Sequence, residues 1–182
     1  MTLFWFLGNT NALPAAVARV LSQYSLPSQL LTLEITESIV LSDADRALGL
    51  LADLRRLGVR LSLDDFGTGY SSLTHLSELP IQQLKIDRSF VSQIHDRSRD
   101  AAIVKAVAEL AGHLDIEVVA EGIETPETAA LLRDLGCGHG QGHLFAQSMA
   151  AELLPVWVST RPQPAGSSGA GTPRNRVLRA VR

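Results

Sequence analysis

Five residues that could do metal-assisted chemistry stand at or near the ends of four short apolar runs: Glu34, Asp64, Asp65, Lys85 and Glu121. A helix-like stretch follows each run, and in such a β-α series the carboxyl ends of the strands meet on one rim. Carboxylates are hard oxygen ligands of the kind that Mg²⁺ and Mn²⁺ prefer. The pattern therefore predicts a metal site on the rim of a β-α fold.

Two such ions, about 3.5–4 Å apart, can activate a water and stabilise the leaving oxygen of a phosphate ester. Lys85 lies between the aspartate pair and Glu121 in sequence, and it could orient that water or neutralise phosphate charge. In a regular strand the side chains of Asp64 and Asp65 point to opposite sides, so both serve one site only where the backbone turns. The alternative is that each acid caps a helix or bonds a loop. Four acids at successive strand ends favour the metal site.

Strands and helices are expected to alternate along the chain. Apolar runs predict strands at 30–35, 61–64, 83–86 and 117–120, with a short fifth near 138–142. Apolar periodicity, capping residues and breakers predict helices at 13–24, 43–57, 98–114, 125–136 and 150–158, and a short one ending at Leu79. This order predicts a parallel sheet or a βα barrel.

The composition of the 182 residues, with 46% apolar and 19% charged side chains, fits a soluble globular protein. The net charge of −3 disfavours a nucleic-acid polymer as partner, because such partners usually require a basic face. The single cysteine, Cys137, allows no internal disulfide and fits the reducing cytoplasm, where we expect it to be a structural residue. No stretch approaches the length of a membrane span, so no membrane segment is expected.

Five motifs make the interpretation more specific. In order they are EITES at 34–38, DDFGTGYSSL at 64–73, LKID at 84–87, AEGIE at 120–124 and QGHLF at 141–145. Together they resemble the EAL-domain family of bacterial signal-transduction proteins, over roughly residues 13–157. The resemblance implies a modified (βα)₈ barrel that cleaves one phosphodiester of cyclic di-GMP, giving linear pGpG with Mg²⁺ or Mn²⁺.

The resemblance also implies which of the site residues bind metal and which act on the attacking water. Glu34 and Asp64 would bind the first metal, and Asp64, Asp65 and Glu121 would bind the second. Lys85 and Glu121 would position or deprotonate the attacking water.

Further roles follow from the same resemblance. Glu37 would brace the loop at 65–72, which links metal binding to dimerisation in the family and makes a homodimer possible here. Gln141 would lie near the water or the substrate, as a catalytic and substrate-binding residue. Asp87 is also expected to bind the substrate.

The opening of the family's pattern is absent. The sequence contains no Glu-Ala-Leu signature and no Asn-Leu-Ser strand end, each of which supplies a metal ligand in the family. We therefore expect an α/β fold that is an incomplete (βα)₈ TIM-type barrel, lacking the first strand and most or all of the second. Residues 1–12 would be an atypical N-terminal segment, 13–158 a partial EAL phosphodiesterase domain, and 159–182 a disordered basic tail.

Three functional hypotheses follow. The first is a cyclic di-GMP phosphodiesterase domain whose two-metal hydrolysis is impaired by the missing ligands, so that activity of this chain alone is weak or absent. The second is an inactive module that binds cyclic di-GMP or another protein. The third is that a neighbouring coding segment supplies the missing strands.

Overall fold

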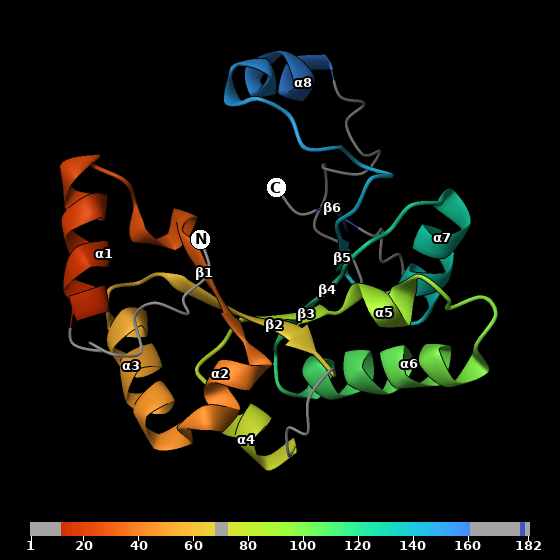
Figure 1. Cartoon of the computed structure of the whole chain (residues 1–182), viewed down its shortest axis with the longest axis horizontal. Coiled ribbons are helices and arrows are strands. Elements are labelled where there is room, and N and C mark those ends of the chain that lie inside the picture. Colours follow the sequence, from red (N-terminus) through yellow and green to blue (C-terminus); the bar gives the residue numbers. More distant parts are fainter. Residues whose placement is uncertain (1–11, 68–72, 161–178, 181–182) are drawn as a thin grey trace, which may run out of the picture.

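The computed structural model describes residues 12–67, 73–160 and 179–180. A parallel sheet runs through the centre, with its strands in sequence order (Figure 1). The strands are β1 (Thr32–Thr36), β2 (Arg60–Phe66), β3 (Gln83–Ile86), β4 (Glu117–Ala120), β5 (His139–Gly140) and β6 (Arg179–Ala180). Within the described ranges the sheet is open, with β1 and β6 at its two ends.

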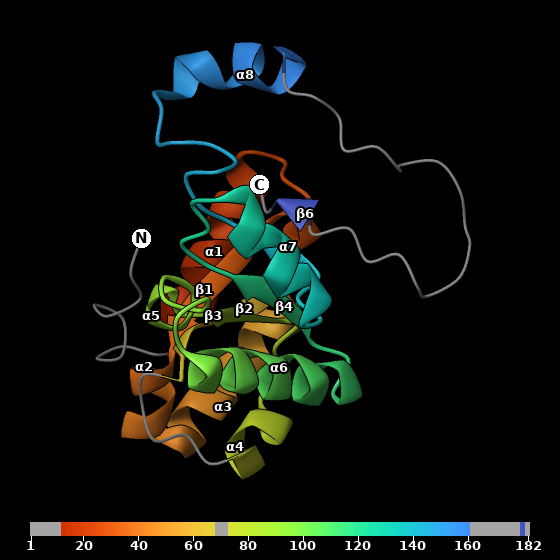
Figure 2. The same cartoon turned by 90° about the vertical axis from the view of Figure 1, so that its right-hand side faces the viewer.

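The helices alternate with the strands along the chain, as the βα pattern predicts, and the first helix precedes the first strand. They are α1 (Ala12–Gln23), α2 (Glu37–Ser42), α3 (Ala44–Arg56), α4 (Leu73–Glu78), α5 (Arg88–Val91), α6 (Ser98–His113), α7 (Pro126–Asp134) and α8 (Leu154–Thr160), with short 3₁₀ helices at Ser28–Leu30 and Ala151–Leu153. Helices α3, α4 and α6 lie on the same side of the sheet, whereas α8 stands away from it on the other side (Figures 1 and 2). None of the described helices is both long and apolar enough to cross a membrane.

The core lies between the central strands and the helices that cover them. Leu61, Leu63, Leu84 and Ile86 are buried on β2 and β3, and Leu54 of α3 is fully buried. Burying a leucine or isoleucine side chain stabilises a fold by roughly 1.5–3 kcal/mol. Along β2 and β3 the buried apolar residues alternate with Ser62 and Lys85, which are buried as well, and the acidic pair Asp64 and Asp65 comes near the carboxyl end of β2.

Helix boundaries follow the capping residues that the sequence offers. The Asp43 carboxylate accepts from the backbone amide of Arg46 at the start of α3. The hydroxyl of Thr125 accepts from the amide of Thr128 at the start of α7, where Pro126 occupies the first turn. The sequence analysis begins these two helices at the same positions, 43 and 125.

Some elements differ from the prediction. Helices α2 and α5 were not predicted, because each is short and begins directly beyond a strand; Asp87 caps α5 by accepting from the amide of Ser89 at 3.0 Å. Strand β1 begins at Thr32 rather than at residue 30, since a 3₁₀ turn precedes it. Strand β2 continues to Phe66, past the expected end at Asp64.

Candidate metal and phosphoester site

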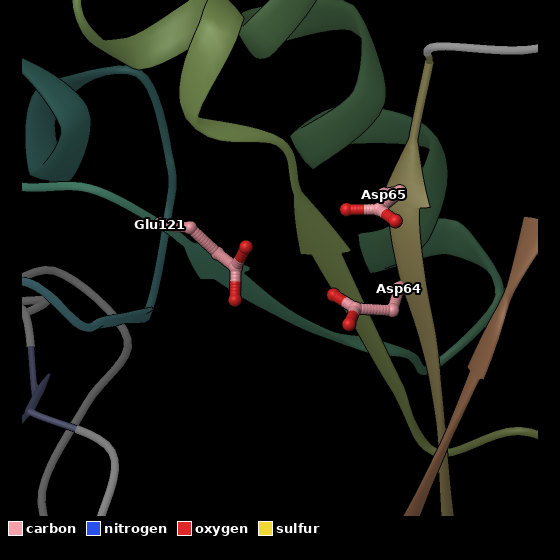
Figure 3. Close-up of side chains that lie close together, drawn as sticks. All are labelled: Asp64, Asp65 and Glu121. Carbon is pink, nitrogen blue, oxygen red and sulfur yellow. The ribbon is translucent and has the colours of Figure 1, made fainter. Parts of the chain in front are cut away.

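Three carboxylates come together at the carboxyl end of the sheet. Asp64 and Asp65 extend from β2 and Glu121 follows β4, with β3 between them (Figure 3). One oxygen of each carboxylate lies within 4.8 Å of one oxygen of each of the other two. The strand-end pattern in the sequence thus corresponds to one compact acidic cluster.

The backbone at Asp65 explains how two adjacent aspartates reach the same cluster. Asp65 has φ of 57°, in the left-handed region that non-glycine residues seldom adopt. The pairing of β2 with β3 shifts register between Leu63 and Phe66 at the same place. A regular strand would turn the two side chains to opposite faces, so this irregularity is what places both beside Glu121. Such local strain is typical of functional sites.

Lys85 of β3 lies at the centre of the acidic group. Its side chain is only 5% exposed, and its Nζ lies 2.6 Å from Glu121 Oε1, 3.0 Å from Asp64 Oδ1 and 3.0 Å from Glu34 Oε1. One buried ammonium therefore pairs with carboxylates from three elements. Glu34 is the outer partner: its side chain is half exposed, and it is not among the three clustered carboxylates.

Burial and charge shift the proton equilibria of this group in opposite ways. Desolvation lowers the pKa of Lys85, but its interactions with Glu121, Glu34 and Asp64 outweigh that effect and raise the pKa above the usual lysine value. Lys85 is therefore a cation at neutral pH. Desolvation raises the pKa of Glu121 despite the opposing pull of Lys85. Desolvation, followed by repulsion from Asp64 and Asp87, raises the pKa of Asp65.

Gln141 is held against Glu121. Its Nε2 donates to Glu121 Oε1 at 2.8 Å, and its backbone amide donates to the carbonyl of Ala120 at 2.9 Å. The structure thus brings Gln141 to the residue that the family resemblance assigns to the attacking water.

Glu37 lies beneath the loop that follows β2. Its side chain is almost completely buried, and Oε2 accepts from the backbone amide of Gly67 at 3.0 Å. This contact fits the loop-bracing role expected from the resemblance. The part of the loop at 68–72, with which a dimer contact was predicted, lies outside the described residues.

Asp87 lies near the cluster but is engaged locally. Its carboxylate caps the N-terminus of α5. Helix capping is the structural role that the sequence analysis gave as the alternative to metal binding. It is close enough to raise the pKa of Asp65 by repulsion. Its expected contact with substrate stays a prediction.

A cavity of about 370 Å³ opens beside the cluster. Glu121 and Gln141 line it together with Arg88, His143, Phe145 and Trp157, which the sequence analysis did not single out. Arg88 directly follows the LKID motif and His143 and Phe145 fall within QGHLF, so motif position was the available signal. An arginine and two aromatic rings beside carboxylates suit a ligand with phosphate and planar groups.

The donor set fits a hard divalent cation. Asp64 Oδ1 is buried, and its charged partner is Lys85 Nζ at 3.0 Å. One lysine ammonium offsets only part of the charge of the three clustered carboxylates, and a cation held by Asp64, Asp65 and Glu121 would offset the rest. All of these ligand atoms are carboxylate oxygens, as Mg²⁺ and Mn²⁺ prefer.

These features define an α/β protein with an acidic site at the carboxyl ends of parallel strands, the place where βα barrels carry their active sites. The sequence model of the EAL domain matches residues 8–148. The chain therefore belongs to the EAL-domain family, whose members include proteins named as cyclic di-GMP phosphodiesterases.

Three relatives illustrate the similarity. The chain is 46% identical over 144 residues to MucR of Pseudomonas aeruginosa, named as a bifunctional diguanylate cyclase and cyclic di-GMP phosphodiesterase; this match covers 79% of the chain and 21% of MucR. A MucR phosphodiesterase structure in complex with c-di-GMP superposes with a TM-score of 0.76 and 45% identity, covering 79% of this chain and 58% of that one. The EAL domain of Mycobacterium smegmatis DcpA gives a TM-score of 0.78 at 38% identity, covering 87% and 71%.

A third solved relative carries metal. Klebsiella pneumoniae BlrP1, in a manganese and cyclic di-GMP complex, has a TM-score of 0.69 and 34% identity, covering 73% of this chain and 34% of that one. Together the solved EAL structures confirm the predicted fold, an α/β protein forming part of a TIM-type barrel. The chain spans about a fifth of the length of the curated relatives it matches.

Proposed function

We propose that this chain is a cyclic di-GMP phosphodiesterase-type domain with a two-metal site, whose hydrolysis to linear pGpG is impaired. The observation that carries the proposal is the convergence of Asp64, Asp65 and Glu121 around buried Lys85 at the strand ends. Relatives named for this activity, and solved relatives with cyclic di-GMP bound, support the substrate.

The proposed hydrolysis adds one water across one phosphodiester. The water oxygen joins phosphorus, the bond from phosphorus to the 3′ oxygen breaks, and a proton ends on that oxygen. The Lys85 ammonium would orient the water and offset phosphate charge. Glu121 would position the water or accept its proton, since its carboxylate lies at the centre of the cluster, 2.6 Å from Lys85 Nζ. Gln141 holds the Glu121 carboxylate in place.

Mg²⁺ or Mn²⁺ would be held by Asp64, Asp65 and Glu121, with Glu34 as a further ligand to a first ion shared with Asp64. When bound, such ions lower the pKa of a water and stabilise charge on phosphate oxygens. Glu34 now faces Lys85 Nζ at 3.0 Å with its side chain half exposed, so it can turn toward an ion without leaving a buried pocket.

The impairment follows from which ligands the sequence contains. The Glu-Ala-Leu and Asn-Leu-Ser motifs, which supply two ligands of the first metal in the family, are both absent. The first ion would then depend on Glu34 and Asp64, while the second keeps all three of its carboxylates. We therefore propose weak or no turnover by this chain alone. We also propose that the chain is cytoplasmic and that it forms a homodimer through the loop at 65–72.

Purified chain, Mn²⁺ and cyclic di-GMP test this proposal, with pGpG formation followed by chromatography and binding followed by calorimetry. Binding with turnover far below that of the MucR phosphodiesterase, assayed in parallel, is the expected result. Turnover equal to that of MucR would contradict the impairment, and absence of both binding and turnover would contradict the function.

The absent ligand motifs also favour a second candidate, an inactive module that binds cyclic di-GMP or a protein partner. Calorimetry distinguishes the two. Nucleotide binding with no pGpG even at high enzyme concentration would support the binding module, whereas slow Mn²⁺-dependent pGpG formation that Glu121→Gln abolishes would support the phosphodiesterase.

A further inference from the structure

Gly142 lies at an unusually close approach of two backbone segments. A Cβ atom built at this position would overlap the backbone oxygen and nitrogen of Ile123 and would lie 2.8 Å from its carbonyl carbon. Only glycine lets the two segments come this near. The neighbouring Gly138 is different, since a Cβ there would meet nothing within 4 Å.

Three backbone hydrogen bonds join the same two segments. Gln141 donates to Ala120 at 2.9 Å, Ile123 donates to Gln141 at 3.1 Å, and Leu144 donates to Ile123 at 3.0 Å. Glu121 therefore lies between two paired residues, and Gln141 takes part in two of the bonds. Because backbone rather than flexible side chain fills the space opposite Gly142, an added methyl could be accommodated only by moving one segment away from the other.

The side chains of these segments meet at the centre of the site. Gln141 Nε2 lies 2.8 Å from Glu121 Oε1, and the same oxygen lies 2.6 Å from Lys85 Nζ. Hydrogen bonds weaken when the donor and acceptor separate by a few tenths of an ångström beyond their usual 2.7–3.2 Å. A separation of the two segments at Gly142 would therefore lengthen the Gln141–Glu121 contact together with the backbone bonds of Ile123.

We propose that Gly142 is a positioning residue that fixes Gln141 against Glu121 by allowing its backbone to touch that of Ile123. Its importance for catalysis rests on the proposed function. The positioning itself concerns the protein without metal or nucleotide, so it can be tested separately.

The test compares Gly142→Ala with Gly138→Ala in the full chain, without metal or nucleotide. Nitrogen-15 NMR follows the side-chain amide of Gln141, assigned by its absence in Gln141→Ala. We expect Gly142→Ala to move this resonance to the position of a solvent-exposed glutamine and Gly138→Ala to leave it unchanged. A folded Gly142→Ala protein whose Gln141 resonance matches the wild type would overturn the proposal, whether or not the chain hydrolyses cyclic di-GMP.

A second measurement separates positioning from general destabilisation. If Gly142 acts through Gln141, then Gly142→Ala and Gln141→Ala should each lower Mn²⁺ affinity, and the double variant should lose no more than Gln141→Ala alone. Additive losses would contradict this. If Gly142→Ala does not fold, hydrogen exchange in the wild type decides: slow exchange of the Ile123 and Leu144 amides supports the contact, and immediate exchange in the folded chain overturns it.

Discussion

Lys85→Met removes the cation on which three carboxylates converge, while keeping a side chain of similar length. Removing one partner of a buried ion pair costs about 3–5 kcal/mol, because it leaves uncompensated charge. Glu121 and Asp64 are the strong partners, being 16% and 21% exposed, whereas Glu34 is 50% exposed and contributes less than about 1 kcal/mol. We therefore expect a loss near the lower limit, about 3 kcal/mol.

The loss should depend on pH in a definite direction. The pKa of Lys85 is raised in the folded chain, so its contribution is complete below the unfolded lysine pKa and is lost only as pH rises above it. In Lys85→Met, the unpaired carboxylates destabilise the folded chain most when ionised. The difference from wild type should therefore be full at pH 7 and smaller in acid, where Glu121, whose pKa is raised by burial, binds a proton and no longer needs a cationic partner.

Urea unfolding followed by far-ultraviolet circular dichroism measures the loss of stability and its dependence on pH. A loss of about 3 kcal/mol corresponds to a fall in melting temperature of roughly 6–12 °C for a chain of this length. Lys105→Met is the matched control, because Lys105 is 60% exposed and lies 4.0 Å from Glu109; its effect should stay within about 0.5 kcal/mol. Equal unfolding midpoints for the two variants at pH 7 would refute the role assigned to buried Lys85.

Three further predictions concern stability and reactivity. Glu37→Ala should cost about 1.5–3 kcal/mol in thermal unfolding, because it removes the buried carboxylate that accepts the loop amide after β2; a change below 0.5 kcal/mol would argue against loop bracing. Gly122→Ala should destabilise the fold by about 1–3 kcal/mol, since φ is +69° and the new Cβ would lie 2.6 Å from Arg88 Cγ. Gly112→Ala is the control: it lies in open space on α6 and should stabilise the fold by about 0.5–1 kcal/mol. Burial raises the pKa of Cys137 to about 12, so a thiol reagent at pH 8 should label it only in denaturant, and rapid labelling of native protein would contradict this.

The sequence predicted the order of elements well because its signals are local. Apolar runs located β2, β3 and β4, and the caps at Asp43 and Thr125 located two helix starts. Helix α5 was missed because four residues carry too little periodicity to detect.

The acidic cluster was predictable, but its geometry was not. Strand-end position put Asp64, Asp65 and Glu121 on one rim, and the structure brings them together. The turn at Asp65 that aligns the aspartates depends on a left-handed backbone and a register shift against β3, neither of which leaves a pattern in the residue types. The close approach at Gly142 likewise joins segments about twenty residues apart and appears only in three dimensions.

A calorimetric titration with Mn²⁺ tests the central claim, that the strand-end carboxylates form a metal site, most directly. The wild type should bind Mn²⁺, and Asp64→Asn should weaken binding at least tenfold, since Asp64 supplies one of the three clustered carboxylates. Asp53→Asn, which changes an exposed aspartate paired with Arg56 on α3, should leave the affinity unchanged. Equal Mn²⁺ affinities for the wild type and Asp64→Asn, or no Mn²⁺ binding by the folded wild type, would contradict the account.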